Sequence, residues 1–270
     1  MDLDELMQMR TVYSIPGMER ARVRKDLVYK TADGKPLKLD LYYPADAGDD
    51  KPLPAVILVH GEWPPEIIEH SKETGGFVST GQLIAASGLV AVNFNHRATE
   101  RLTRLHEAAG DVRDLITYLR DNAATLGVDR DRLCVWVFSA GMPLGMWAAM
   151  HDTPSYVRCI VGYYGVMDLE SVRKSLPGKV SKEELREFSA LHHLREHPKE
   201  IAPTFLAKAG RDRPGLIGTI DLFTEEAHRL GANVEVMAHE DGQHGFDVLD
   251  DDACSREIIK RTLEFITENI

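Results

Sequence analysis

The feature that most constrains the fold is an unbroken apolar run that ends at a serine. Residues 133–138 are six apolar residues, and Ser139, Ala140 and Gly141 follow directly. Such a run, preceded by polar residues, predicts a strand buried on both faces of a parallel sheet. A helix-like stretch, 142–150, comes next, so Ser139 stands at a sharp turn from strand to helix. That is the geometry of a nucleophile elbow, which holds a serine in a strained backbone conformation with its hydroxyl above the sheet.

The elbow motif is incomplete in this chain. The pattern Gly-x-Ser-x-Gly lacks its first glycine, because Val137 stands in that place and needs small neighbours. A serine at a strand end also occurs as a turn residue or helix N-cap. The motif alone therefore leaves a nucleophilic and a structural serine open, and the rest of the chain has to decide.

Strand and helix patterns alternate along the chain. The first two strands are joined by a turn at 32–35 and are expected to be antiparallel at a sheet edge. The remaining short connections favour an α/β fold, a doubly wound and mostly parallel sheet with helices on both faces. The predicted strands are 22–30, 37–43, 54–59, 89–94, 133–138, 157–164, 204–209 and 233–238. The predicted helices are 77–87, 107–126, 142–150, 217–230 and 253–269.

The chain shows no repeats or linkers that would divide it. We expect an N-terminal arm of residues 1–20 and a single domain of residues 21–270, which is long enough to bury a substantial core. A charged segment at about 168–200 is expected to be a small excursion over the sheet, outside its core.

Charge and cysteine content limit the classes of function. The net charge of −11, from 32 basic and 43 acidic residues, disfavours binding to nucleic acid or to an anionic membrane. Three widely spaced cysteines indicate free thiols in a reducing compartment. With no signal-like or membrane-length apolar run, the sequence predicts a cytoplasmic protein. The sequence does not determine the oligomeric state, and a homo-oligomer is compatible with it.

Polar residues that follow the strands are the candidate functional groups, because ligands bind at the carboxyl ends of parallel strands. Ser139, Asp212 and His244 follow three different predicted strands. A serine needs a base to become nucleophilic, and the base needs a carboxylate to fix its tautomer. Asp241 and Asp247 are alternatives to Asp212 as this carboxylate. The structural alternative for His244 is an ordinary histidine in a surface loop.

The chain resembles the α/β-hydrolase superfamily, particularly small esterases and dienelactone-hydrolase-like proteins, from about residue 22 to the end. The residues that carry the resemblance are His60-Gly61, Phe138-Ser139-Ala140-Gly141, Ala209-Gly210-Arg211-Asp212 and Gly242-Gln243-His244-Gly245-Phe246. By this resemblance Ser139 is the nucleophile, His244 the general base and then acid, and Asp212 the orienting carboxylate.

The resemblance also implies an oxyanion hole of backbone amides, one from Ala140 and one from Glu62 or Trp63. Glu62 departs from the glycine that many esterases have there. We expect its carboxylate to be solvated, and the alternative is that it enters the pocket and selects for cationic or neutral substrates. Dienelactone hydrolases use a cysteine nucleophile, so their lactone substrate does not carry over. His60 is expected to be a structural histidine that packs the oxyanion loop.

Four residues near the predicted site are expected to line a substrate pocket, although each would also suit an ordinary core. They are Trp63, Met142, Tyr163 and Tyr164. His192, His193 and His197 resemble metal ligands in spacing, but no cysteine or carboxylate cluster completes a site, so no metal is expected.

These residues favour a serine hydrolase that cleaves carboxylic esters of small or medium substrates through an acyl-enzyme intermediate, without a cofactor. The excursion at 168–200 is too short for a large lid. A peptidase or amidase of the same fold is the alternative enzyme. A protein that keeps the hydrolase fold and binds a small ligand without turnover is the alternative of another class.

Overall fold

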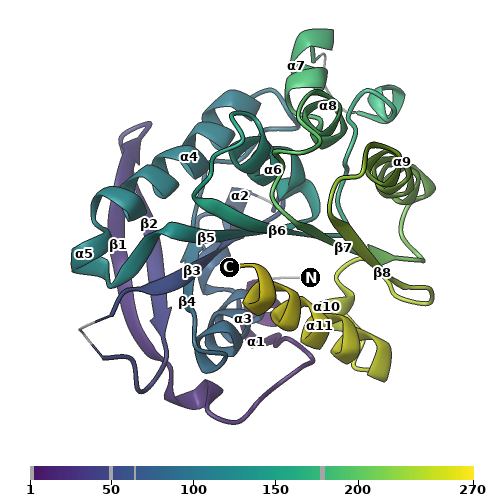
Figure 1. The fold of residues 1–270 in the computed structure, drawn as a ribbon. Coiled ribbons are helices and arrows are strands. Elements are labelled where there is room, and N and C mark those ends of the chain that lie inside the picture. Colours follow the sequence, from purple (N-terminus) through teal and green to yellow (C-terminus); the bar gives the residue numbers. More distant parts are fainter. Residues whose placement is uncertain (1–2, 49–50, 64, 177–179) are drawn as a thin grey trace.

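A computed structural model of the 270-residue chain describes residues 3–48, 51–63, 65–176 and 180–270. Its strands form a single sheet in the order β1-β2-β4-β3-β5-β6-β7-β8 (Figure 1). The pairs β1–β2 and β2–β4 are antiparallel and the others are parallel, which confirms the predicted fold class. The strands are β1 Arg22–Ala32, β2 Lys35–Tyr43, β3 Leu53–Val59, β4 Val90–Phe94, β5 Val128–Phe138, β6 Val157–Tyr163, β7 Thr204–Ala209 and β8 Val234–His239.

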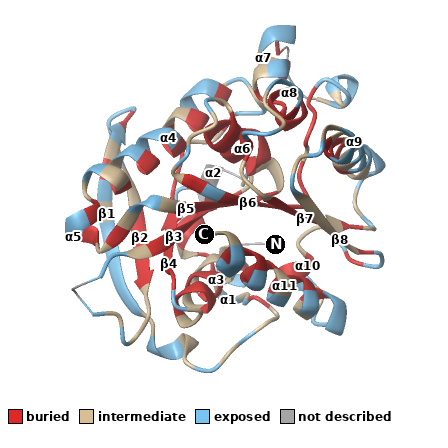
Figure 2. Ribbon diagram, viewed as in Figure 1, coloured by how far each residue is buried: buried red, intermediate tan, exposed pale blue. Residues whose placement is uncertain are grey.

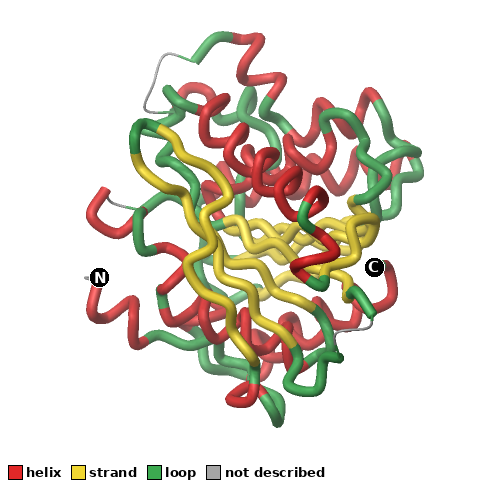
Figure 3. Tube along the Cα trace, turned by 90° about the vertical axis from the view of Figure 1, so that its left-hand side faces the viewer, coloured by secondary structure: helices red, strands yellow, loops and turns green. Residues whose placement is uncertain are grey.

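Helices cover both faces of the sheet (Figures 1 and 3). One layer contains α4, α6, α8 and α9, and the other contains α1, α3 and α11. In the described part of the chain, no helix is long and apolar enough to cross a membrane. The helices are α1 Leu3–Gln8, α2 Pro65–Ile68, α3 Gly75–Ala86, α4 Leu105–Asp121, α5 Ala123–Leu126, α6 Met142–Met150, α7 Lys182–Glu187, α8 Ala190–Glu196, α9 Pro214–Leu230, α10 Phe246–Leu249 and α11 Ala253–Asn269. Single 3-10 turns lie at Met18–Arg20, Ser71–Glu73, Ser139–Gly141 and Arg173–Ser175.

The apolar part of the central strand β5, residues 133–138, is buried on both faces, as its sequence predicts (Figure 2). Because successive side chains of a strand point to opposite faces, its residues divide between two cores. Leu133, Val135 and Val137 pack in the core under α4 and α6, and Cys134, Trp136 and Phe138 pack in the core under α3 and α11. β5 therefore fixes the position of the serine that follows it.

Two predicted boundaries differ from the structure. The helix predicted at 107–126 is divided into α4 and α5, because Asn122 ends α4 with a backbone and a side-chain hydrogen bond to the Tyr118 carbonyl. β5 begins at Val128, before the apolar run, because Val128 pairs with Leu53 at the start of β3.

The segment 168–200 contributes to the core, contrary to expectation. Its apolar residues Leu185, Phe188, Leu191 and Leu194 are at most 2% exposed and belong to the core that contains α6. Leu185 lies in α7, Phe188 directly after it, and Leu191 and Leu194 in α8, while Arg186, between Leu185 and Phe188, is exposed.

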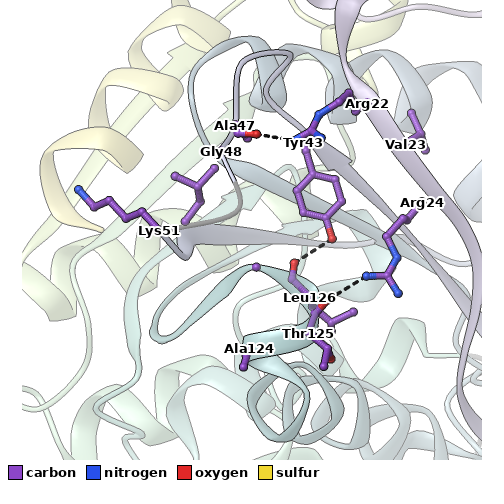
Figure 4. A pocket seen from close by; sticks show the side chains of 12 residues that line it. Arg22, Val23, Arg24, Tyr43, Ala47, Gly48, Lys51, Ala124, Thr125 and Leu126 are labelled. Carbon is purple, nitrogen blue, oxygen red and sulfur yellow. Dashed lines mark hydrogen bonds between the residues drawn. The ribbon is translucent and has the colours of Figure 1, made fainter.

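At the start of β5, the hairpin β1–β2 is anchored to the end of α5 (Figure 4). The Tyr43 hydroxyl donates to the Leu126 carbonyl at 2.9 Å, and the Arg24 guanidinium donates to the Thr125 carbonyl at 3.0 Å. The last carbonyls of a helix have no partner within the helix, and these donors supply one. A cavity of about 360 Å³ lies here, at the opposite end of β5 from Ser139.

Candidate active site

Ser139 occupies a tight turn between β5 and α6. Its φ is 52°, in the left-handed region that a non-glycine residue rarely adopts. A residue held there costs about 1–3 kcal/mol, which the packing around it must offset. This strained turn is the predicted elbow, and it lifts the serine off the end of the strand.

The elbow tolerates Val137 because a glycine faces it. A Cβ atom at Gly145, in α6, would lie 2.5 Å from one Val137 methyl carbon and 3.0 Å from the other. Gly145 therefore provides the space that the first glycine of the motif would provide if it stood at position 137. This is the small neighbour that the β-branched side chain requires.

Ser139, His244 and Asp212 are joined by hydrogen bonds. The Ser139 Oγ lies 2.7 Å from His244 Nε2, and His244 Nδ1 lies 2.5 Å from Asp212 Oδ2. The imidazole is 37% exposed, while the Asp212 side chain is 5% exposed. The structure thus brings together three residues from three strand ends in the order that the sequence predicts.

The surroundings of Asp212 keep its carboxyl group ionised. Burial acts to raise its pKa, but hydrogen bonds from His244 and from the Arg213 amide, at 2.7 Å, bring the pKa below its ordinary value. The alternative carboxylates have other partners, since Asp241 pairs with Arg211 and Asp247 accepts a hydrogen bond from Tyr164. Asp212 is therefore the aspartate that the structure brings to His244.

The loop after β3 lies beside the elbow. A Cβ atom at Gly61 would be 3.1 Å from Ser139 Cβ and 3.4 Å from the Ala140 amide nitrogen, so a glycine allows this close approach. The Ala140 amide is in the first turn before α6, where backbone N–H groups have no partner within the helix. The loop after β3 and the turn that carries the Ala140 amide therefore lie against each other at the serine.

His60 contacts this loop from inside the protein core. Its ring is fully buried, stacks on His96 with centroids 3.7 Å apart, and its Nδ1 lies 2.7 Å from the Gly61 carbonyl oxygen. Burial, together with His96, lowers the pKa of His60 well below its ordinary value, so the ring is neutral. This agrees with the structural role expected from the sequence.

Glu62 connects the same loop to the segment after β4. Its carboxylate accepts hydrogen bonds from the Thr99 amide at 3.2 Å and the Thr99 hydroxyl at 2.9 Å. The residue is exposed and borders two cavities that meet at Ser139. The exposed carboxylate thus lies beside the site, where Thr99 holds it.

We name these two the inner and the outer cavity. The inner cavity has about 300 Å³ and the outer about 380 Å³, and both contain Ser139 and Tyr164 in their walls. The inner cavity also includes His244 and the apolar side chains of Leu6, Met9, Phe77, Phe138, Val248 and Leu249. The outer cavity is lined by Arg101, Leu102, Val172, Arg213 and Leu216, among others.

Two of the four expected pocket residues are in the core instead. Trp63 and Tyr164 line the inner cavity, whereas Met142 and Tyr163 line neither cavity and are at most 1% exposed. Tyr163 ends β6 and points into the core under α11, where its hydroxyl bonds to Thr262. Met142 packs against Gly162 and Gly165 beneath α6.

The sequence interpretation missed other cavity residues. Leu6 and Met9 come from the N-terminal arm, Val248 and Leu249 from α10, and Arg101 from the segment after β4. The apolar spacing of Leu6 and Met9 is the sole signal in the arm, and it does not indicate what they contact. Among the described residues, no group of three or more His, Cys, Asp or Glu is arranged to hold a metal ion.

Comparison with known proteins places this geometry in a family. The BD-FAE family model matches residues 39–205, more than half of the chain. Similar solved structures include a thermophilic esterase, Est2, from Thermogutta terrifontis with butyrate bound, with a TM-score of 0.72 and 24% identity over 94% of this chain and 95% of that one. The same esterase phosphonylated by sarin gives a TM-score of 0.72 and 24% identity over 94% and 96%.

The propionate-bound form of Est2 gives a TM-score of 0.71 and 23% identity over 94% of this chain and 96% of that one. No curated protein matches the sequence. At these identities the solved structures establish the fold, and the family model covers the region from β2 to β7. The chain has the α/β-hydrolase fold and belongs to the BD-FAE family.

Proposed function

We propose that the protein is a serine hydrolase that cleaves carboxylic esters of small or medium size through an acyl-enzyme intermediate. The observation that carries the proposal is the hydrogen-bonded series from Ser139 Oγ through His244 to Asp212. A serine in a strained turn, with a base at 2.7 Å and an ionised carboxylate behind the base, has the parts that nucleophilic acyl transfer requires.

In the first step, Ser139 Oγ attacks the ester carbonyl carbon while His244 Nε2 accepts the hydroxyl proton. The carbonyl oxygen becomes an oxyanion, which the amide of Ala140 and an amide of Glu62 or Trp63 stabilise. Loss of one such donor raises the barrier by roughly 3–4 kcal/mol. The buried Asp212 carboxylate stabilises the imidazolium that forms.

The first intermediate then collapses: the bond from the carbonyl carbon to the alcohol oxygen breaks, and the alcohol departs with the proton that His244 returns to it. This leaves the acyl group on Ser139, and the second half of the reaction removes it. A water molecule then gives a proton to His244 and attacks the acyl group on Ser139. Collapse of this second intermediate releases the carboxylic acid and restores the serine. Every proton movement uses the same imidazole, which is 37% exposed and so accessible to water.

The similar structures support an ester as substrate. Est2 is named an esterase, binds butyrate and propionate, and is phosphonylated by sarin. Small carboxylic acids are products of ester cleavage, and phosphonylation is the reaction of an organophosphate with an activated nucleophile. The apolar inner cavity beside Ser139 suits an acyl or alkyl group of similar size.

A fluorophosphonate probe and a panel of p-nitrophenyl esters from acetate to octanoate test this proposal. We expect labelling and ester hydrolysis by the wild type, both lost in Ser139→Ala. Ser87→Ala, which alters a serine at the end of α3, is the matched control and should retain both. Absence of labelling and hydrolysis in the wild type would favour the ligand-binding alternative. Faster cleavage of matched amides than of esters would favour the peptidase alternative.

We also infer a cytoplasmic location and small-molecule substrates in place of nucleic acid. Cys134 and Cys159 pair across β5 and β6, are fully buried, and are free thiols. Neighbouring thiols that remain reduced suit a reducing compartment. Fractionation of cells with an antibody to the protein tests the location, and recovery outside the cytoplasm would contradict it.

A further inference from the structure

The N-terminal arm is attached to the domain at three points. The Thr11 amide donates to Ser79 Oγ at 2.8 Å, and the Val12 amide donates to the Asp247 carbonyl at 2.9 Å. A Cβ atom at Gly75, the first residue of α3, would overlap the carbonyl oxygen of Met9. A glycine at this position therefore lets the arm lie directly on the start of α3, and Figure 1 shows α1 beside α3.

The attached arm contributes directly to the inner cavity. Leu6, from α1, is 3% exposed, and both Leu6 and Met9 line the cavity that contains Ser139 and His244. The arm is also joined to α10, because the carbonyl that Val12 contacts belongs to Asp247. α10 supplies Val248 and Leu249 to the same cavity. Arm and α10 thus form one wall, and residues 3–12 precede the region that the family model matches.

The two cavities differ in what they can accept. The outer cavity is bordered by the exposed residues Arg101 and Arg213, so a group bound there can leave to solvent. The inner cavity is bounded on the arm side by apolar side chains. In an acyl-enzyme reaction the alcohol departs first, while the acyl group stays on the serine. The alcohol therefore suits the outer cavity and the acyl chain the inner one.

We propose that the N-terminal arm closes the inner cavity through Leu6 and Met9 and so limits the length of the acyl chain that the enzyme accepts. This inference rests on the proposed esterase function. A cavity of about 300 Å³ is at the small end of ligand pockets, so truncating either side chain adds a large fraction of usable space. One methylene group that fits or does not fit changes kcat/KM by roughly 10–200-fold.

Leu6→Ala and Met9→Ala test the proposal, with Met7→Ala as the matched control on the same helix. Met7 is absent from the cavity wall, so its truncation changes α1 without enlarging the cavity. The measurement is kcat/KM for p-nitrophenyl butyrate and octanoate. We expect the octanoate-to-butyrate ratio to rise about tenfold or more in Leu6→Ala and Met9→Ala and to stay unchanged in Met7→Ala.

A second readout separates this inference from the proposed function. Each arm substitution is combined with Ser139→Ala, and dissociation constants of the same two esters are measured by calorimetry. A wild type that hydrolyses neither ester would contradict the proposed function, while the dissociation constants still decide the role of the arm. We expect tighter octanoate binding, by about tenfold, in the Leu6 and Met9 variants.

Two results would overturn the inference. One is an octanoate-to-butyrate ratio in the Leu6 and Met9 variants equal to that of Met7→Ala, in both readouts. The other is a change limited to the alcohol chain, measured with ethyl and hexyl acetate, which would place the alcohol in the inner cavity. Leu6→Val, a smaller truncation, decides the outcome if Leu6→Ala does not fold, as judged by thermal unfolding.

Discussion

Asp212 and Asp247 both lie near His244, and they have opposite electrostatic behaviour. Asp247 is buried, with 6% of its surface exposed, whereas Asp212 is half-buried. The pKa of Asp212 lies below its ordinary value, whereas burial raises the pKa of Asp247 to about 6. The same residue type thus stays ionised at one position and is protonated below about pH 6 at the other.

The difference comes from the deeper burial of Asp247 and from the donors that each carboxyl group receives. Asp212 accepts from His244 and from the Arg213 amide, which outweigh the effect of burial. Asp247 accepts a hydrogen bond from the neutral Tyr164 hydroxyl at 2.5 Å, and this bond offsets only part of the effect of burial on its pKa. The hydrogen bond to His244 and the shallower burial of Asp212 therefore decide which aspartate can stabilise a cationic His244.

The largest expected effect is on catalysis. We expect Asp212→Asn to lower kcat by about 10⁴-fold, because an amide cannot stabilise the imidazolium and favours the wrong histidine tautomer. Asp247→Asn should lower kcat by about tenfold at most, since its side chain contacts Tyr164 and not the imidazole. Steady-state rates on p-nitrophenyl butyrate measure both. Losses of equal size would show that the two aspartates share one role and would break the comparison.

The second expected effect is on stability. Because the pKa of Asp247 is about 6 in the folded protein and 3.8 ordinarily, the folded state binds this proton more tightly. Its contribution to the free energy of unfolding is therefore full at low pH and is lost as the pH rises from about 4 through about 6. The loss amounts to about 3 kcal/mol for a difference of about two pH units. Asp212, whose pKa is lowered, stabilises the folded state at pH values above its ordinary pKa. This contribution is lost as the pH falls below that value.

Urea unfolding of the wild type and Asp247→Asn at about pH 4 and about pH 8 measures this effect. We expect the variant to gain up to about 3 kcal/mol relative to the wild type between the two conditions, because an amide does not ionise. Asp212→Asn provides the contrast, since its difference from the wild type should be constant over this range. A constant difference for Asp247→Asn as well would mean that the pKa of Asp247 is not raised in the folded protein.

A smaller effect is expected from the donor to Asp247. Tyr164→Phe removes the hydroxyl but keeps the ring, whose centroid lies 4.7 Å from that of His244. A hydrogen bond to a charged group contributes about 1.5–3 kcal/mol, so we expect a loss near the lower end at about pH 8 and less at about pH 4. The pKa of Asp247 should rise further. In the Asp247→Asn background the same substitution should cost less, and an unchanged cost would indicate that Tyr164 stabilises through packing alone.

Sequence periodicity predicted the parts of the fold that local patterns specify. The bounds of β7 and α11 agree with the prediction, and the apolar run before Ser139 indicated the central strand. Ser139, Asp212 and His244 converge because parallel strands end at the same edge of a sheet, so their chain positions were informative. The choice of Asp212 over Asp247 depends on hydrogen-bond donors, which the sequence does not order in space.

Other features had a signal that the sequence interpretation did not use. Ser181 and Glu184 form a capping box that starts α7, a recognisable pattern before a helix. In contrast, the contact between Val137 and Gly145 and the seating of the arm on Gly75 depend on how elements pack. No local pattern in the chain specifies them.

The smallest expected effect concerns a third carboxylate near the site. Glu62 is exposed, and its carboxylate accepts from the uncharged Thr99 amide and hydroxyl, so an amide oxygen in Glu62→Gln can accept the same hydrogen bonds. We expect kcat/KM for p-nitrophenyl butyrate to change by less than about threefold.

An exposed charge is screened by water and contributes about 1 kcal/mol at most to selection of a cation. The ratio of rates on butyrylcholine and its uncharged isostere, 3,3-dimethylbutyl butyrate, should therefore change by less than about fivefold. A larger change would show that Glu62 selects substrates by charge despite its exposure, and burial would then be a poor guide to the roles of the three carboxylates.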